Sequence, residues 1–313
     1  MYNKHLDEDK HLTINERMDV PSSKSAIISI IGKPNVGKST LLNRIIGQKI
    51  SIVTPKAQTT RNVINGITTI NNVQLIFLDT PGIFDAKRAV DQHIVRQAWS
   101  SINGADFVII MLDTSYKVTD STIKILERVA AQGLRTIIVI NKVDVKNSNL
   151  IEILKYFVNN PHISKVPIFQ ISALNGDGVE LLMNYLVNHA PLSPWNYEID
   201  DITTLPMRFL ATEITREQLF LKLQQELPYN LTVSNEKWEN FDNGSVKIHQ
   251  VINVATAAHK KMIVGKRGAM IQAIGSASRQ QFEAIYGIQA HLFLFVRVQA
   301  GFLDNPNAFS RID

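Results

Sequence analysis

The sequence has 313 residues, 45% of them hydrophobic and 19% charged, and a formal net charge of +5. This composition excludes a fibrous or largely disordered protein, and the length suits two domains better than one. The absence of cysteine excludes disulfides and thiolate metal sites, and no apolar run approaches the roughly 18 residues of a membrane-spanning helix.

Residues 1–23 are predicted to form a disordered N-terminal extension. The first 21 positions carry five acidic and three basic side chains and lack the apolar segment of a secretory signal. They are also too acidic for a typical mitochondrial presequence. We therefore expect folded structure to begin near residue 24.

The first folded unit is predicted to be a strand, a phosphate-binding loop and a helix. An Ile-rich apolar run at 26–31 precedes the loop, and a run with helical spacing follows it at 40–46. Residues 32–39 match G-x-x-x-x-G-K-[ST] at every fixed position. The glycines let backbone N–H groups face a phosphate chain, Lys38 adds a positive charge, and the Ser39 hydroxyl suits a Mg2+ ligand. The residues predicted to bind the phosphates are Gly32, Lys33, Pro34, Asn35, Val36, Gly37, Lys38, Ser39 and Thr40.

Two β-rich runs, residues 63–70 and 73–78, are separated by two asparagines. This pattern predicts a hairpin, which places one antiparallel edge strand on an otherwise parallel sheet. The second run leads into a D-x-x-G motif. Asp79 at the carboxyl end of a strand can hold Mg2+ through water, and Gly82 lets a backbone N–H approach the terminal phosphate. The nucleotide-binding residues predicted here are Asp79, Thr80, Pro81 and Gly82.

Apolar strands at 107–112 and 136–140 continue the alternation, and the second of them ends in the sequence N-K-V-D. The carboxylate of Asp144 can accept hydrogen bonds from the N1–H and N2–H2 groups of guanine, donors that adenine lacks. Lys142 can lay its alkyl stem on the base, and Asn141 can tie this loop to the phosphate loop. The motif therefore predicts selection of guanine over adenine.

The last strand of the first domain is predicted at 166–171. It ends in Ser172, Ala173 and Leu174, where a backbone N–H can meet the O6 atom of guanine. Helices predicted at 87–102, 119–132 and 178–190 separate the strands. This order is typical of an α/β P-loop NTPase fold over residues 24–190, with a mostly parallel sheet, one antiparallel edge strand and helices on both faces.

A proline-containing linker is predicted at 191–204, followed by a second domain of the α+β class at 205–302 and a C-terminal tail at 303–313. The predicted elements of the second domain are a helix at 213–226, strands at 229–233 and 245–255, a helix after residue 268 and a strand at 291–298.

A Gly-Lys-Arg-Gly sequence at 265–268 lies between these elements. Its position resembles that of the GXXG loop of a type II KH domain, which clamps about four nucleotides of single-stranded RNA. The surrounding residues 260–279 include five basic and no acidic side chains, an electrostatic pattern suited to a nucleic-acid backbone. The residues predicted to bind RNA are Lys260, Lys261, Gly265, Lys266, Arg267, Gly268 and Arg279.

Residues 27–190 resemble the translation-factor-related GTPases, and residues 49–61 are similar to the first switch of the bacterial Era GTPases. The resemblance implies that Thr60 reaches Mg2+ when the terminal phosphate is present, with the adjacent Thr59 as the alternative. The implied Mg2+ ligands are Ser39, Thr60 and Asp79.

Hydrolysis is expected to be slow without a partner. Ile83 stands where Ras-like enzymes carry a glutamine that orients the attacking water, and an apolar side chain cannot do this. Related GTPases use the residue at the position of Asn35 to hold K+, whose charge replaces an arginine finger. The residues implied in catalysis are Lys38, Thr60, Asn35 and Gly82.

A GTPase domain followed by a KH domain resembles the Era family over residues 27–301, with similar segments at 211–214, 226–229 and 260–265. Two features depart from the family pattern. Residues 254–258 are less charged than expected, and Phe302 stands where a tryptophan is usual.

The resemblance implies a switch protein that uses GTP/GDP, Mg2+ and, as a further ion, K+. It implies binding to the 3′ end of 16S (small-subunit) rRNA, a role in assembly of the 30S ribosomal subunit, and a monomer in the cytoplasm with peripheral contact to the inner membrane. Two alternatives stay open: a nucleotide-dependent RNA-binding or chaperone module in which hydrolysis is incidental, and a sibling Era-like GTPase acting on another RNA.

Overall fold

The structure, a computed structural model, describes residues 23–86, 88–146, 149–160, 163, 165–224 and 227–301. The predicted N-terminal extension therefore lies outside the described residues except for Ser23. The same is true of Phe302, of the tail at 303–313, and of Glu226 within the 226–229 segment.

The first domain is built on a six-stranded sheet in the order β2-β3-β1-β4-β5-β6. Its strands are β1 (Lys24–Gly32), β2 (Ile64–Ile70), β3 (Val73–Asp79), β4 (Phe107–Asp113), β5 (Thr136–Asn141) and β6 (Ile168–Gln170). β2 pairs antiparallel with β3, and every other pair is parallel. The predicted P-loop NTPase sheet with one antiparallel edge strand is confirmed.

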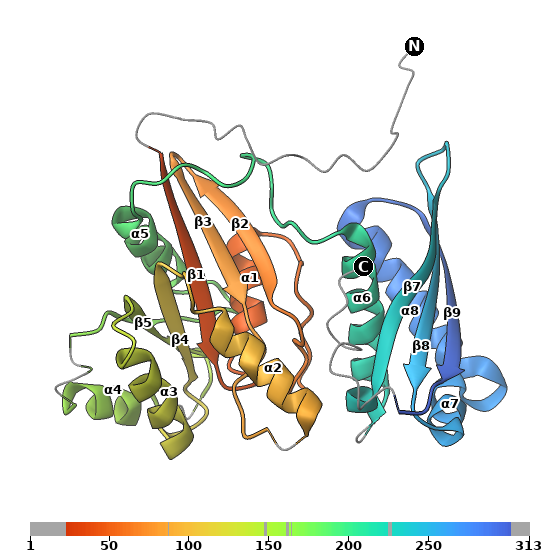
Figure 1. Cartoon of the computed structure of the whole chain (residues 1–313), viewed down its shortest axis with the longest axis horizontal. Coiled ribbons are helices and arrows are strands. Elements are labelled where there is room, and N and C mark those ends of the chain that lie inside the picture. The colour runs from red at the N-terminus through yellow and green to blue at the C-terminus, as the bar shows by residue number, and fades with distance from the viewer. Residues whose placement is uncertain are drawn as a thin grey trace, which may run out of the picture.

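Helices cover both faces of this sheet (Figure 1). They are α1 (Lys38–Ile46), α2 (Ala89–Ser100), α3 (Asp120–Ala130), α4 (Leu150–Val158) and α5 (Val179–His189). Apolar side chains of α1 and α5 pack on one face, and those of α2, α3 and α4 pack on the other. The carboxyl ends of the parallel strands thus stay open, where ligands bind in sheets of this kind.

Helix α4 was not among the predicted elements, and β6 is shorter than the strand predicted at 166–171. Ile153 and Phe157 of α4 are fully buried against the sheet. Since these two side chains lie four residues apart, they share one face of the helix. That spacing was the available sequence signal for α4.

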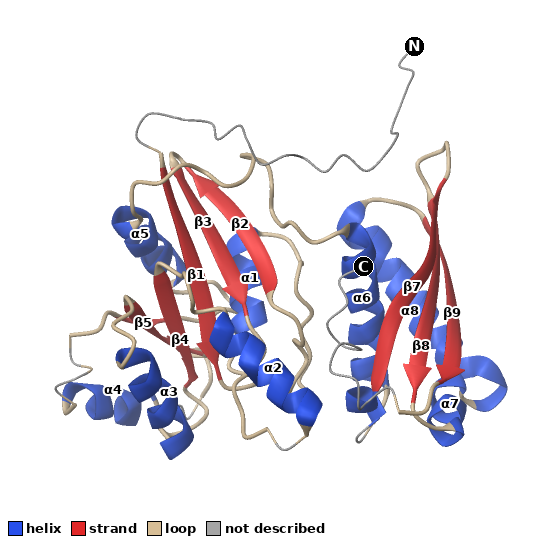
Figure 2. Ribbon diagram, in the orientation of Figure 1, coloured by secondary structure: helices blue, strands red, loops and turns tan. Residues whose placement is uncertain are grey.

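The second domain has the order helix, strand, strand, helix, helix, strand (Figure 2). Its elements are α6 (Met207–Lys222), β7 (Leu231–Asn240), β8 (Val246–Val254), α7 (Ala257–Val264), α8 (Ala269–Tyr286) and β9 (Ala290–Val298), with short 3-10 helices at Leu227–Asn230 and Lys266–Gly268. β8 lies between an antiparallel β7 and a parallel β9. Apolar residues of α6 and α8 pack on one face of this sheet. The predicted α+β KH fold is confirmed.

Two elements of this domain extend beyond their predicted bounds. α6 begins at Met207, six residues before the predicted start, directly after Pro206 in an extended conformation. Phe209 and Leu210 in its first turn are buried in the core of the first domain. β7 continues to Asn240 because its second half pairs with β8 across an irregularity between Asn235 and Lys237.

The linker runs along the first domain. The side-chain amide of Gln74 accepts hydrogen bonds from the N–H groups of Asn196 and Tyr197, at 2.8 and 3.1 Å, and donates to the Tyr197 carbonyl at 2.8 Å. Farther along, the N–H of Ile67 on edge strand β2 donates to the carbonyl of Ile202 at 2.8 Å. These bonds fix the path along which the chain enters the second domain.

Candidate functional site

Residues 32–39 form a curled loop between β1 and α1, as the sequence predicts for a phosphate-binding loop. Gly32 and Gly37 have φ values of +155° and +102°, conformations that favour glycine. A Cβ atom on Gly32 would lie 2.5 Å from the carbonyl oxygen of Met111, and one on Gly37 would lie 2.2 Å from Nδ2 of Asn141. Both positions therefore require glycine for space as well as for conformation.

Lys38 is the first residue of α1 and is only 6% exposed. Its Nζ donates to the carbonyls of Lys33 at 3.0 Å and Gly32 at 3.4 Å, so the ammonium group lies under the loop. Burial lowers the pKa of Lys38 to about 8, and the nearby Asp79 carboxylate partly offsets this effect. A phosphate chain in the loop would supply the negative charge that the buried ammonium lacks.

The lowered pKa of Lys38 predicts pH-dependent nucleotide binding. A bound phosphate favours the charged lysine, so above pH 8 binding must take up a proton. We expect the Kd for GDP to rise about tenfold between pH 7 and pH 9, since the protonated fraction falls about tenfold for each pH unit above the pKa. Titration of fluorescent GDP at several pH values measures this, and a flat profile would contradict it. In the Lys33→Ala control, the same pH dependence should persist.

In the nucleotide-free protein, the lowered pKa of Lys38 affects folding stability. A rise in pH weakens nucleotide binding but should stabilise the fold. The unfolded chain keeps the Lys38 proton up to the ordinary pKa of 10.5, whereas the folded chain loses it near 8. The unfolded state therefore binds more protons between these values, and the free energy of unfolding should rise as the pH increases through this window.

The three predicted Mg2+ ligands lie together. Ser39 Oγ donates to Asp79 Oδ2 at 2.6 Å and lies 3.0 Å from Thr60 Oγ1. Asp79 is fully buried, and its Oδ1 atom has no hydrogen-bond partner among the described residues. Burial raises the pKa of Asp79, while Lys38 and the hydroxyls of Ser39 and Ser51 oppose that shift. A buried carboxylate oxygen beside two hydroxyls fits a hard divalent cation.

The adjacent Thr59 lies differently. Its hydroxyl bonds to Thr54 Oγ1 at 2.6 Å and to the Lys56 carbonyl at 2.8 Å, within its own loop. Among the described residues, no group of three or more His, Asp or Glu side chains could hold a metal ion.

The D-x-x-G motif packs against the phosphate loop. A Cβ atom on Gly82 would lie 2.6 Å from the backbone nitrogen of Pro34, so only glycine permits this contact. The N–H of Ile83 donates to the Gly32 carbonyl at 2.9 Å, and the Thr80 hydroxyl donates to the Ile30 carbonyl at 2.7 Å. The Ile83 side chain is buried, and it offers no polar group to a water molecule.

Asn141 joins three loops, as its predicted role requires. Its Nδ2 donates to the carbonyl of Val36 in the phosphate loop at 2.8 Å, and its Oδ1 accepts from the N–H of Ala173 at 2.8 Å. The Ala173 N–H is therefore used within the protein, so a guanine O6 atom must be met by another N–H of the 172–174 loop or replace this bond. Asp144 and Leu174 are exposed.

Lys142 has a partner that sequence reasoning missed. Its Nζ lies 2.5 Å from Oδ2 of Asp113, whose side chain is only 2% exposed at the end of β4. The neighbouring Thr114 hydroxyl donates to the Lys142 carbonyl at 2.6 Å. The available signal was an acidic residue at the carboxyl end of a strand next to β5. Asp113 thus fixes the position of the Lys142 ammonium group, and with it the alkyl stem that is predicted to cover a guanine base.

Replacing Asp113 with asparagine should speed GDP dissociation about tenfold, because a charge-assisted hydrogen bond is worth about 1.5–3 kcal/mol and its loss frees the Lys142 stem. Stopped-flow release of fluorescent GDP measures the rate. Asp113→Glu keeps the charge and should restore slow release. Unchanged release in Asp113→Asn, at unchanged thermal stability, would contradict this positioning role.

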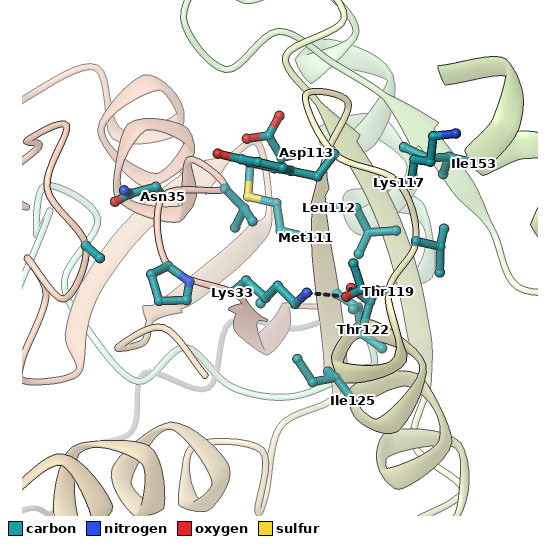
Figure 3. Close-up of a pocket in the computed structure, with 17 residues that line it drawn as sticks. Lys33, Asn35, Met111, Leu112, Asp113, Lys117, Thr119, Thr122, Ile125 and Ile153 are labelled. Atoms are coloured by element: carbon teal, nitrogen blue, oxygen red, sulfur yellow. Dashed lines mark hydrogen bonds between the residues drawn. The ribbon is translucent and has the colours of Figure 1, made fainter. Parts of the chain in front are cut away.

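Lys33 points away from the phosphate side of the loop. Its Nζ donates to the Thr119 hydroxyl across an adjoining cavity of about 310 Å³, between the phosphate loop, the end of β4 and α3 (Figure 3). Burial lowers the pKa of Lys33, and Asp85 partly offsets this shift. The Lys33 side chain is therefore engaged with Thr119, away from the predicted phosphate position. A separate cavity of about 470 Å³ holds Lys38, Ser39, Thr60 and Lys142.

Helix α6 of the second domain holds the loop that carries Thr59 and Thr60. Glu217 is almost fully buried and accepts hydrogen bonds from the N–H of Val53 at 2.8 Å and from Lys49 Nζ at 2.6 Å. Arg216, also buried, donates to the carbonyl of Thr59 and is paired with Glu213 at 2.7 Å. These side chains were not predicted as functional residues, because their partners lie more than 150 positions away in the sequence.

Basic residues of the same loop reach back to the second domain. Arg61 is 5% exposed and donates to the carbonyls of Pro228, Tyr229 and Leu231 at 2.8–3.1 Å. The Lys56 ammonium donates to the carbonyls of Phe220 and Leu223 at the end of α6, where a helix presents unpaired carbonyls. Side chains of α6 thus bond to the predicted first switch, and side chains of the switch bond to backbone carbonyls of the second domain.

The Gly-Lys-Arg-Gly loop joins α7 to α8. Gly265 and Gly268 have φ values of +73° and +79°, and Lys266 and Arg267 are exposed. The loop ends at the N-terminus of α8, which favours a phosphate. Lys260 and Lys261 are exposed on α7. The structure does not bring Arg279 to this loop: it lies three turns along α8 and forms an ion pair with Glu283 at 2.9 Å.

Both domains of the chain are similar to known protein families. Residues 27–142 match the family described as 50S ribosome-binding GTPase, and residues 226–301 match the KH domain family. The chain is 47% identical to GTPase Era of Rickettsia bellii (strain RML369-C), covering 91% of this chain and 96% of the relative. It is 42% identical to GTPase Era of Mesorhizobium japonicum, covering 96% and 97%.

Two solved structures are similar over nearly the whole chain. Era in complex with MgGDPNP and nucleotides 1506–1542 of 16S ribosomal RNA has a TM-score of 0.86 and 33% identity, covering 92% of this chain and 98% of the other. An Aquifex aeolicus Era variant bound to GDP·AlF4− has a TM-score of 0.87 and 32% identity, with the same coverage.

No helix in the described part of this chain is long and apolar enough to cross a membrane.

Proposed function

This chain belongs to the Era family of GTPases, and from that premise we propose that it is a GTP-dependent switch that binds the 3′ end of 16S rRNA and acts in assembly of the 30S subunit. The chain is a GTPase with a KH domain. The observation that carries the proposal is the attachment of the loop holding Thr60 to helix α6 of the KH domain.

For the nucleotide, we propose that the phosphates lie in the loop at 32–40 and against the D-x-x-G motif at 79–82. The base would be read by Asp144, covered by Lys142 and approached by the loop at 172–174, with Asn141 holding these loops together. The similar Era structure with MgGDPNP supports this arrangement. Lys38, held under the loop, supplies a fixed positive charge for the terminal phosphates.

Ser39, Thr60 and Asp79 are the proposed residues for Mg2+, because their oxygens already lie together beside the unpaired Asp79 Oδ1. When bound, Mg2+ neutralises charge on the phosphate oxygens. Thr60 is preferred to Thr59, whose hydroxyl faces its own loop. Loss or gain of the terminal phosphate would thus be sensed at the residue next to Arg61, within a segment bound to the KH domain.

Hydrolysis is proposed to depend on positioning and charge. Lys38 and the Gly82 backbone orient and stabilise the terminal phosphate, and the apolar Ile83 leaves the attacking water without a protein carboxamide. Asn35, whose amide donates to the Pro55 carbonyl at 3.0 Å, is the proposed residue for K+. Slow turnover that rises with K+ is the expected behaviour.

For RNA, we propose that the loop at 265–268 clamps the strand, with Lys260, Lys261, Lys266 and Arg267 against its phosphates. The solved Era complex with 16S rRNA nucleotides supports this choice of RNA. Our proposal does not include Arg279 among the residues that clamp the RNA, because its guanidinium group is paired with the Glu283 carboxylate. Action in the cytoplasm, peripheral contact with the inner membrane and the monomeric state stay predictions of the family resemblance.

The test is binding of an RNA with the sequence of nucleotides 1506–1542 of 16S rRNA, at fixed salt, with a GTP analogue, with GDP and without nucleotide. Tighter binding with the GTP analogue is expected, and equal affinity in the three states would overturn the switch. Gly265→Asp should abolish tight binding while GDP affinity stays normal, because it adds a negative charge and a Cβ atom 2.6 Å from that of Met270. Gly133→Asp, at a position of similar φ with open space, is the matched control.

The alternative is an RNA-binding module in which hydrolysis is incidental. Its one support is the apolar Ile83, which cannot orient the attacking water. The Thr60→Ala variant separates the two readings. If hydrolysis resets the switch, this variant should bind GTP and RNA but release RNA slowly. Release at the normal rate would favour the RNA-binding module in which turnover is incidental.

A further inference from the structure

The outer face of the KH-domain sheet carries exposed aromatic side chains. Phe293 and Phe295 on β9 are 45% and 52% exposed. The alternate residues of β9, namely Leu292, Leu294 and Val296, pack inward on the clusters formed with α6 and α8. Because side chains alternate along a strand, both phenylalanines face away from the helices. Large apolar groups exposed together on one face are characteristic of a contact surface.

A histidine completes an aromatic group on this face. His249 on β8 lies directly opposite Phe293 in the parallel register. Its ring centroid is 4.9 Å from that of Phe293 and 6.0 Å from that of Phe295, with interplanar angles of 22° and 12°. The His249 ring is therefore stacked on both phenylalanine rings. Nε2 of His249 is buried and has no hydrogen-bond partner among the described residues. We call Phe293, Phe295 and His249 the aromatic platform.

Charged side chains border the aromatic platform. Lys247 Nζ lies 5.9 Å from the ring centroid of Phe293, and Arg297 is on the same strand and face as the two phenylalanines. Each cation is paired with a carboxylate of β7: Lys247 with Glu239 at 3.6 Å, and Arg297 with Glu236. Lys237 of β7, which lies opposite His249, is also paired with Glu239, so three cations and two carboxylates border the platform. The net charge of the border is small, and a ligand of the platform would be held mainly by its contacts with the rings.

We propose that the aromatic platform is a second RNA-binding surface, on which unpaired bases stack beyond the clamp. This inference rests on the proposed RNA-binding function. Exposed aromatic side chains on a sheet are a recurrent means of holding single-stranded RNA, since every base has a flat face and stacking tolerates sequence. Rings already stacked on one another suit such an arrangement, and the Lys247 and Arg297 side chains can reach the connecting phosphates.

The position of the platform next to the clamp supports RNA as its ligand. The second half of β8, from His249 to Val254, leads into α7, which ends at Val264 directly before Gly265 of the clamp loop. β9 pairs with β8 over its full length, up to Val298 opposite Val254. A strand held at the clamp would therefore be tethered near the platform, which raises the effective concentration of its next bases.

The experiment compares two single-stranded RNAs from the 3′ tail of 16S rRNA on the full-length protein with a GTP analogue. The short RNA has about four nucleotides, enough to fill a KH clamp, and the long RNA has about twelve. The long RNA carries 2-aminopurine outside the clamped bases, and the fluorescence of this base falls when it stacks. The double variant Phe293→Ala/Phe295→Ala is compared with Leu221→Ala, which removes an equally exposed apolar side chain from α6.

The double variant should lose about fivefold or more in affinity for the long RNA, with no change for the short RNA. It should also lose the 2-aminopurine quenching, and Phe295→Trp should retain both properties. Because no phosphate contact is removed, the slope of log affinity against log salt should stay at the wild-type value, whereas Lys266→Ala should reduce it by about 0.7. Leu221→Ala should behave as wild type.

Three results would overturn the proposal. If the double variant binds the long RNA as wild type does, the platform has no role while the proposed function stands. If wild-type protein binds neither RNA, the proposed RNA-binding function is wrong, and the platform proposal, which rests on it, is wrong as well. If wild-type protein instead sediments with phosphatidylcholine/phosphatidylserine vesicles, and the double variant loses this property with unchanged RNA affinity, the surface is a membrane contact.

Discussion

Asp144→Asn is expected to lower affinity for GTP about 1,000-fold and to transfer the preference to xanthosine triphosphate. In the proposed site the carboxylate of Asp144 would accept hydrogen bonds from N1–H and N2–H2 of guanine, whereas an asparagine would present its own N–H2 to the guanine amino group. Xanthine carries a carbonyl oxygen at that ring position, which an asparagine can meet with a hydrogen bond. Asp144 is exposed at the end of β5, so the substitution should leave the core unchanged.

Competition against fluorescent GDP with guanosine, adenosine and xanthosine triphosphates measures this change. Asp120→Asn, at another exposed position in the same domain, should keep the wild-type order of affinities. Equal binding of ATP and GTP by the wild-type chain would remove the basis of the base-reading site. If the Asp144→Asn variant still prefers GTP, residues other than Asp144 must be responsible for the selection of guanine.

Gly37→Ala is expected to weaken GDP binding about 100-fold or more. Gly37 has a φ of +102°, and the added methyl group would lie 2.2 Å from Asn141 Nδ2, the atom that donates to Val36. The clash separates the phosphate loop from the base-reading loop, and a shift of about 1 Å in a positioned group can cost about a hundredfold. The positive φ adds a strain of about 1–3 kcal/mol, which should also lower the thermal stability.

Gly47→Ala is the matched control for this variant. Gly47 also has a positive φ, +75°, but no atom lies within 4 Å of the position of an added Cβ. It should therefore show a loss of stability with near-normal GDP affinity. If both variants lost the same affinity, backbone strain and not the contact with Asn141 would explain the defect of Gly37→Ala.

The nucleotide-binding loops could be predicted from the sequence because their signals are local. The strand, loop and helix around Lys38 lie within about twenty adjacent residues, and the hairpin before Asp79 is marked by its turn asparagines. The parallel sheet then brings motifs far apart in the sequence to one edge, since each motif follows a strand. This is why Ser39 lies within hydrogen-bond distance of Asp79. Thr60 precedes the antiparallel strand β2 and so reaches the same edge, where its hydroxyl lies 3.0 Å from that of Ser39.

Other features depend on partners that no local pattern contains. The acidic and basic residues of α6 have the composition of a solvated helix face, yet Arg216 and Glu217 are buried against the first domain. The basic segment 260–279 ends four positions before Glu283, whose carboxylate is paired with Arg279. Asp113 could be recognised as the partner of Lys142 only when β4 and β5 were known to be neighbours.

For the proposed switch, the attachment of α6 to the loop around Thr60 has a consequence for the order in which RNA and nucleotide bind and leave. By thermodynamic reciprocity, if GTP strengthens the hold on RNA by some factor, RNA must strengthen the hold on GTP by the same factor. A subunit precursor whose 3′ end is bound would then raise the affinity of the protein for GTP and so slow the loss of the nucleotide. Departure of the tail into its mature position would lower GTP affinity without any separate exchange factor.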